Sequence, residues 1–281
     1  MSDKKSVLIP DYIRKTSRIL QVSSKYLATK YAVKLFSTPI KFRMPRNEQF
    51  YVDQSQTSSL EVPTIGKTLN VFKYGQGPKK ALLIHGWSGR GTQLAHFAKA
   101  IEKEYTVYSF DGPSHGKSTG KTTNMREFIY SIEALDAAYG PFDLGIGHSL
   151  GGMALINANA MGVPFKKIVS IGAGDTITEI AQDFVAKIEL KPLYGPRLKN
   201  HFDKKFKQDV DDFSSHKAAK NVKIPALIVH DKQDIEVSVS CAESIRQNLE
   251  HGSLLITEGL GHTKILRNKE LIAQVKTFID A

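Results

Sequence analysis

The residues most suited to chemistry in this chain form the pentapeptide Gly-His-Ser-Leu-Gly at positions 147–151. It lies between two apolar stretches, residues 144–146 and residues 153–156, which predict a buried strand followed by a helix. A G-x-S-x-G sequence in that context forms a sharp turn that exposes the serine hydroxyl, because its glycines let strand and helix approach closely. We therefore predict that Ser149 is a nucleophile.

A serine hydroxyl at neutral pH needs a histidine to accept its proton, and the histidine needs an acid to fix its tautomer. His262 follows the last predicted strand, in a Gly-Leu-Gly-His segment whose small residues suit a loop that passes close to the serine. Asp234 follows the preceding strand. Because all three residues follow predicted parallel strands, we expect Ser149, Asp234 and His262 to meet at one edge of a sheet as a catalytic set.

The elements that would position these residues alternate along the chain. The pattern predicts strands at residues 68–74, 81–84, 105–110, 144–147, 168–171, 224–229 and 254–256, separated by helices at 91–102, 125–138, from 150, 240–249 and 269–279. Such alternation is typical of an α/β fold with a mostly parallel, twisted sheet and helices on both faces.

The alternation is interrupted at about residues 175–220, where helical periodicity appears without a buried strand. An apolar stripe runs through Ile177, Ile180 and Phe184, and Pro192 and Pro196 are expected to end it. We predict that this segment is a helical lid over the substrate. Its aromatic and aliphatic side chains favour an apolar acyl or aromatic group over a phosphate-rich one.

The N-terminal segment differs from the rest in charge. The chain has a formal net charge of +11, and residues 1–50 contain eleven Lys or Arg against three Asp or Glu. Residues 11–37 are predicted to form one basic amphipathic helix, followed by a connector to residue 60. Two interpretations remain open: the helix packs on the rest of the chain or on a second subunit (self-association), or it is a peripheral membrane helix.

The overall composition excludes several classes of protein. A length of 281 residues fits one α/β domain with an insertion, and 41% hydrophobic with 24% charged residues is typical of a globular protein. No apolar run reaches the roughly 18 residues of a membrane span, and no signal-peptide core is present. With Cys241 as the single cysteine, no internal disulfide is expected, and a cytoplasmic location is the default.

The sequence shows no sign of a bound cofactor or nucleic acid. There is no cluster of zinc ligands, no glycine-rich phosphate loop and no RNA-binding signature in the sequence. We therefore predict a small-molecule substrate, with no metal ion, cofactor or nucleic acid.

From about Val62 to Ala281 the chain resembles the α/β-hydrolase superfamily, within its lidded esterase, lipase and acyl-hydrolase branch. Besides the serine turn, the resemblance depends on residues 85–87 (His-Gly-Trp), 111–118, 230–237 and 261–262 (Gly-His). It implies a domain at residues 61–281 with a Ser-His-Asp triad, and an oxyanion hole made by the backbone N–H groups of Trp87 and Leu150. It also implies that the histidines at positions 85, 115 and 148 make local hydrogen bonds.

The chain departs from the usual pattern of this superfamily at two positions. Ser114, in the segment 111–118, stands where glycine is common in this superfamily. Asp231 does so in the segment 230–237, the acid loop, which also contains Asp234. Asp231 is therefore a rival to Asp234 as the acid. Asp111 and Glu127 are weaker rivals, and the family pattern makes Asp111 a structural loop residue.

The sequence thus predicts a serine hydrolase that cleaves a carboxylic ester or thioester through an acyl-enzyme. Two alternatives remain. The same triad could act on a carbon–carbon or amide bond, since the fold does not decide the bond. Alternatively, the protein could be a non-catalytic, hydrolase-like binding protein that recruits a partner through its basic N-terminal helix.

Overall fold

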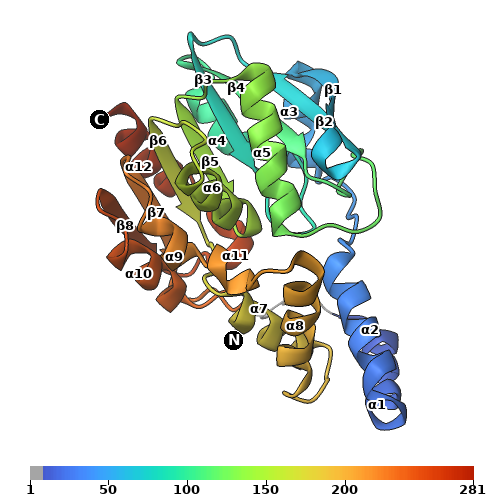
Figure 1. The fold of residues 1–281 in the computed structure, drawn as a ribbon. Coiled ribbons are helices and arrows are strands. Elements are labelled where there is room, and N and C mark those ends of the chain that lie inside the picture. The colour runs from blue at the N-terminus through green and yellow to red at the C-terminus, as the bar shows by residue number, and fades with distance from the viewer. Residues whose placement is uncertain (1–8) are drawn as a thin grey trace.

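The computed structural model describes residues 9–281 (Figure 1). One eight-stranded sheet has the order β1-β2-β4-β3-β5-β6-β7-β8, in which β3 to β8 are mutually parallel and β1 and β2 are antiparallel to their neighbours. The strands are β1 (Gln56–Val62), β2 (Lys67–Tyr74), β3 (Lys79–Ile84), β4 (Tyr105–Asp111), β5 (Leu144–His148), β6 (Lys167–Ile171), β7 (Ala226–Asp231) and β8 (Gly252–Thr257). The expected mostly parallel sheet is confirmed.

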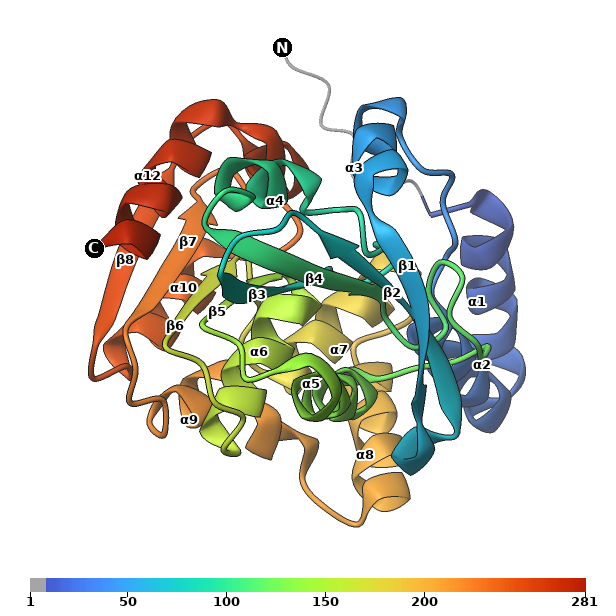
Figure 2. The ribbon, with the colours of Figure 1, turned by 90° about the horizontal axis from the view of Figure 1, so that it is seen from above.

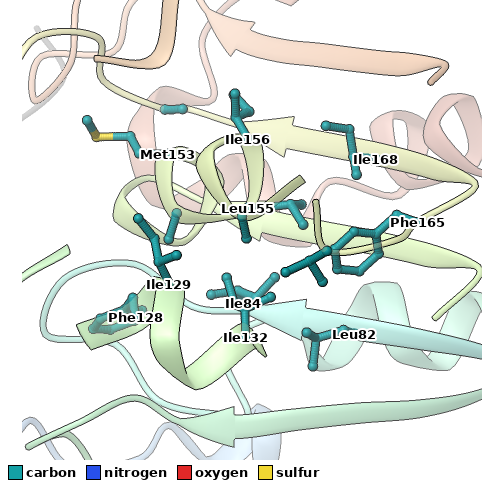
Figure 3. Packing of buried hydrophobic residues seen from close by; sticks show 14 of the residues in the cluster. Leu82, Ile84, Phe128, Ile129, Ile132, Met153, Leu155, Ile156, Phe165 and Ile168 are labelled. Carbon is teal, nitrogen blue, oxygen red and sulfur yellow. The ribbon is translucent and has the colours of Figure 1, made fainter. Parts of the chain in front are cut away.

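Helices cover both faces of the sheet (Figure 2). On one face lie α5 (Met125–Tyr139), α6 (Leu150–Ala160), α9 (Ser215–Ala219) and α10 (Val239–Gln247); on the other lie α3 (Gln49–Gln54), α4 (Ala95–Ile101) and α12 (Lys269–Asp280). Figure 3 shows one of the three cores, where Ile132 of α5 and Leu155 of α6 pack near Leu82 and Ile84 of β3. This packing fixes β5 and α6, and with them the turn that carries Ser149.

A helical insertion separates β6 from β7, as the sequence predicts. It contains α7 (Ile177–Lys187) and α8 (Tyr194–Phe206), and no strand is found among its residues, all of which the structure describes. The side chain of Thr176 caps α7 by accepting the N–H of Glu179. The expected role of Pro196 is wrong, because it lies in the first turn of α8, where proline is tolerated.

The single helix predicted for residues 11–37 is also wrong, because the structure has two helices, α1 (Asp11–Ser23) and α2 (Lys25–Ser37). The chain is extended at Ser24 (φ −158°, ψ 117°), and the Ser24 side chain caps α2 by accepting the Leu27 N–H. Serine stabilises a helix start in this way. The two helices form a hairpin whose inner face, including Ile13 and Ala28, packs against α7 and α8 (Figure 1).

The segment predicted as a connector, residues 38–60, contains regular structure. It includes α3, and β1 pairs with β2 along its whole length, so the sheet begins at Gln56. The loop helix α11 (Gly261–Lys264) follows β8 and carries His262. Among residues 9–281, no helix has the length and apolar character needed to cross a membrane.

Candidate active site

Ser149 occupies a strained turn between β5 and α6. Its backbone has φ 52° and ψ −120°, a conformation that is rare for residues with a side chain. The flanking glycines make the turn possible: a Cβ at Gly151 would lie 2.3 Å from the Ile84 carbonyl oxygen, and one at Gly147 would lie 2.4 Å from the Gly151 carbonyl oxygen. The Ser149 N–H donates to Ile171 O at 2.8 Å, which ties the turn to β6. The serine side chain is half-buried rather than enclosed.

His262 and Asp234 form a buried hydrogen-bonded pair. His262 Nδ1 lies 2.6 Å from Asp234 Oδ2, and the side chains are 8% and 1% exposed. The other carboxylate oxygen, Oδ1, accepts the N–H groups of Glu236 (2.8 Å) and Val237 (3.0 Å). Burial by itself would raise the pKa of Asp234, but these hydrogen bonds hold it below its ordinary value of 3.8. An ionised Asp234 keeps the proton of His262 on Nδ1 and leaves Nε2 free to accept another.

The lowered pKa of Asp234 predicts a specific sensitivity to acid. Because the folded-state pKa lies below the unfolded value, the ionised carboxylate stabilises the fold above pH about 4, and this stabilisation is lost as pH falls through the folded-state pKa. We expect the Tm of the wild type to fall more steeply than that of Asp234→Asn between pH about 5 and about 2. Calorimetry over that range checks this, and parallel curves would contradict it.

The rival carboxylates lie elsewhere. Asp231 Oδ2 accepts the Thr257 hydroxyl (2.8 Å) and the Leu260 N–H (3.0 Å), so it joins the acid loop to the loop that carries His262. Asp111 is buried and accepts backbone N–H groups of two loops. Glu127 pairs with Lys67. Among these four carboxylates, Asp234 is the one that is hydrogen-bonded to His262.

Ser149 and His262 line the same cavity, of about 500 Å³. Within the described chain, the Ser149 hydroxyl makes no hydrogen bond to the His262 ring. The neighbouring His148 contacts the histidine loop directly, because its Nε2–H donates to His262 O at 2.9 Å. Burial, and then the nearby His262, lower the pKa of His148 to about 3, so it stays neutral. His148 therefore tethers the His262 loop to the serine turn, a role that the sequence reasoning gave only as a local hydrogen bond.

The two residues proposed to supply the oxyanion donors line the same cavity. Trp87 follows β3, Leu150 is the first residue of α6, and both line the cavity with Ser149. Neither backbone N–H has an acceptor among the residues that the structure describes. Two unpaired N–H groups beside a serine hydroxyl are suited to bind a developing negative charge.

Two neutral histidines hold the loop that carries Trp87. His115 Nε2 accepts the Ser88 N–H at 3.0 Å, and His85 Nε2 accepts the Gly112 N–H at 2.7 Å. Burial lowers their pKa values to about 3 and about 4. The expected local hydrogen bonds are also present, because Nδ1 of His85 lies 2.7 Å from Gly86 O and Nδ1 of His115 lies 3.0 Å from Pro113 O.

The N-terminal segment also holds this loop, which the sequence reasoning missed. Glu48 is buried and accepts the Thr92 hydroxyl at 2.5 Å, and Arg90 Nη1 lies 3.2 Å from the same carboxylate oxygen. The Ile40 N–H donates to Ser88 Oγ at 2.9 Å. The sequence does contain one sign of this role, because Glu48 is the only acidic residue between positions 12 and 52 of an otherwise basic segment.

The cavity wall is mostly apolar, and its helical residues come from α2, α5, α6, α7, α8, α10 and α11. Phe36 of α2 contacts Phe184 of α7 and Phe202 of α8, with ring centroids 5.1 Å and 5.7 Å apart. The wall continues with Met125, Met153, Ile177, Ile180, Phe206 and Phe213. Cys241 also faces the cavity, but burial raises the pKa of its thiol to about 11, so it is protonated at neutral pH. Among residues 9–281, no group of three or more His, Cys, Asp or Glu side chains is arranged to hold a metal ion.

Sequence comparison finds esterases among the similar curated proteins. The chain is 35% identical over 86 residues to a pimeloyl-acyl-carrier protein methyl ester esterase of Stenotrophomonas maltophilia (strain R551-3), which covers 31% of this chain and 32% of that protein. It is 31% identical over 105 residues to the protein of that name from Xanthomonas campestris pv. campestris (strain B100), covering 37% and 40%. The match thus spans about a third of the length of these relatives.

Structural comparison agrees on the fold. An esterase of Pyrococcus furiosus superposes with a TM-score of 0.65 at 17% sequence identity, over 87% of this chain and 97% of that chain. A protein of Acinetobacter baumannii AYE described as a putative lipase superposes with a TM-score of 0.62 at 20% sequence identity, over 85% of this chain and 97% of that chain. A membrane phospholipase A superposes with a TM-score of 0.64 at 16% sequence identity, over 97% of this chain and 98% of that chain. The family model described as "Alpha/beta hydrolase family" matches residues 81–273. The chain therefore belongs to the alpha/beta hydrolase family.

Proposed function

We propose that this protein is a serine hydrolase that cleaves a carboxylic ester or thioester through an acyl-enzyme. The observation that carries the proposal is the 2.6 Å pair of His262 Nδ1 and Asp234 Oδ2 beside the strained Ser149, with all three residues in or behind the wall of one apolar cavity. Such a pair has little structural purpose at a cavity wall, whereas a hydrolytic serine requires it.

In the first half of the proposed reaction, Ser149 Oγ attacks the carbonyl carbon while His262 Nε2 takes the hydroxyl proton. The N–H groups of Trp87 and Leu150 stabilise the oxyanion, and the bond to the leaving group then breaks. The leaving group departs with the proton from His262. Catalytic hydrogen bonds are often long until substrate binds, and the proposal requires the Ser149–His262 bond to form with an ester in place.

In the second half, a water molecule attacks the acyl-enzyme. His262 Nε2 accepts a proton from this water and returns it to Ser149 Oγ as the ester bond to the serine breaks. The products are a carboxylic acid and the free enzyme. No redox step or further reactant is involved.

The proposed substrate carries an apolar acyl or aromatic group. The phenylalanines of α2, α7 and α8 line a space of about 500 Å³. The α7–α8 insertion, which contributes to this wall, is the proposed lid. The similarity to methyl ester esterases supports ester chemistry. We expect kcat/KM for p-nitrophenyl esters to rise from acetate to medium-chain acyl groups by about fourfold per added CH₂, because each buried CH₂ contributes ~0.8 kcal/mol. A panel from acetate to palmitate tests this, and a preference for acetate would contradict it.

The proposal also assigns a positioning role to Glu48, through the loop of Trp87. We expect Glu48→Gln to lower kcat by roughly tenfold, because a small displacement of an oxyanion donor is costly. It should also lower the free energy of unfolding by about 1–3 kcal/mol through the weakened buried hydrogen bonds. Ester turnover and urea unfolding measure the two effects.

The matched control for Glu48 is Glu104→Gln, which removes a more exposed pair with Lys276 (3.1 Å). We expect it to change the free energy of unfolding by less than about 1 kcal/mol and to leave kcat unchanged. Equal effects of the two substitutions on kcat would refute the positioning role.

A further inference from the structure

Exposed apolar side chains are concentrated in the N-terminal helices. Of the twelve large hydrophobic side chains exposed in residues 9–281, seven lie between positions 12 and 42. They are Tyr12, Ile19, Val22, Tyr26, Leu27, Ile40 and Phe42. Such a concentration is unusual on a protein surface and is typical of a site that contacts another apolar phase.

Three of the four most exposed of these side chains gather where α1 meets α2, whereas the fourth, Tyr12 (68%), lies near the start of α1. Val22 is 78% exposed, Ile19 64% and Tyr26 63%. Gln21 of α1 joins this end of the hairpin to the turn between α7 and α8, because its Nε2 donates to Glu189 O (3.2 Å) and its Oε1 accepts the Lys191 N–H (3.1 Å). That turn contributes a further exposed apolar side chain, Leu193. We call this surface, formed by Ile19, Val22, Tyr26, Leu27 and Leu193, the hairpin tip.

Basic side chains surround the hairpin tip. Lys15, Lys25 and Lys30 are exposed, and within the described chain none of them forms an ion pair. The one acidic residue of α1 and α2, Asp11, is paired with Arg14 at 2.8 Å. The surface therefore combines apolar side chains that are free to insert with uncompensated positive charge at their edge.

We propose that the hairpin tip docks on an anionic phospholipid bilayer. Apolar side chains at a helix end insert among acyl chains, while flanking lysines contact negatively charged headgroups. A second copy of this chain fits less well, because the basic rims of two copies would repel each other.

The fold gives this docking a consequence for the cavity. The hairpin and the α7–α8 insertion share one apolar core. Three of these four helices, α2, α7 and α8, carry phenylalanines of the cavity wall. A bilayer on the hairpin tip would therefore lie against the same helical unit that lines the cavity. The inference does not depend on the proposed role of Ser149, so it is tested with the Ser149→Ala protein as well as the wild type.

The test is flotation of the full chain with vesicles of phosphatidylcholine alone or of phosphatidylcholine mixed with phosphatidylglycerol. We expect binding to the mixed vesicles that weakens as salt is added, and much weaker binding to phosphatidylcholine alone. Changing Lys15, Lys25 and Lys30 together to Gln should lower the partition coefficient about a hundredfold, since each lysine near an anionic surface contributes about fivefold. Changing Ile19 and Val22 to Ser should lower it by at least roughly tenfold.

Matched controls lie on exposed surface far from the hairpin. Met161→Ser removes another exposed apolar side chain, and Lys166→Gln removes another exposed lysine, which pairs with Asp143 at 2.7 Å. Both should leave vesicle binding unchanged. All variants alter exposed side chains, and circular dichroism checks that they fold.

Three outcomes would overturn the proposal. The first is that the wild type fails to bind mixed vesicles. The second is that the hairpin variants bind vesicles as well as the control variants do. The third is that light scattering shows a dimer, that the Ile19 and Val22 substitutions dissociate it, and that no vesicle binding is found. The last outcome would assign the hairpin tip to self-association. Because vesicle binding is measured without substrate, none of these results bears on the proposed ester hydrolysis.

Discussion

Replacing Ser149 with alanine is expected to lower kcat for p-nitrophenyl butyrate by about 10⁵-fold, to the residual rate that the oxyanion hole and substrate binding supply without the nucleophile. The reason is that no other described side chain is placed to form an acyl-enzyme in the cavity, and the Cys241 thiol is protonated. Ester turnover with purified protein measures the loss.

The control for this substitution is Ser253→Ala, an exposed serine of β8, which should keep full activity. We expect Ser149→Ala to retain the wild-type circular dichroism and Tm, because the side chain is half-exposed and makes no hydrogen bond that the fold needs. A folded Ser149→Ala protein with wild-type turnover would refute the proposed mechanism.

Replacing Asp234 with asparagine is expected to lower kcat by about 10⁴-fold. The amide cannot keep the proton of His262 on Nδ1 or stabilise the positively charged imidazole, although its size is nearly the same. KM should change little, since Asp234 lies behind His262 and does not face the cavity. Steady-state kinetics of the folded variant test both expectations.

Asp231→Asn is the matched comparison, because the two carboxylates are three residues apart on one loop. Asp231 makes no contact with His262 and accepts hydrogen bonds from Thr257 and Leu260. Its replacement should lower Tm and reduce kcat by less than about a hundredfold, through displacement of the histidine loop. A larger loss of kcat in Asp231→Asn than in Asp234→Asn would identify Asp231 as the acid.

Much of the sheet could be predicted from the sequence because its strands and helices are encoded locally. Buried strands such as residues 144–147 are short apolar runs, and all but the strand at residues 224–229 are followed by a glycine-containing turn. The parallel order then follows from the alternation, and it brings the loops after β5, β7 and β8 together. For this reason the residues predicted as a catalytic set could be named before their distances were known.

The N-terminal segment could not be predicted to the same extent. The apolar stripe of residues 11–37 continues in phase across Ser24, so periodicity alone does not reveal the break that Ser24 capping creates. The contacts of Glu48 with Arg90 and Thr92 join residues more than 40 positions apart and leave no periodic signal. The resemblance to hydrolases did not help either, because it begins at about Val62.

The most direct measurement of the central claim is labelling with a fluorophosphonate, which reacts only with an activated serine. Mass spectrometry of the digested protein should find one label per chain, on Ser149, and the label should be lost in His262→Ala as well as in Ser149→Ala. An unlabelled wild type, or a Ser149 that reacts equally well in His262→Ala, would contradict activation of this serine by the His262–Asp234 pair.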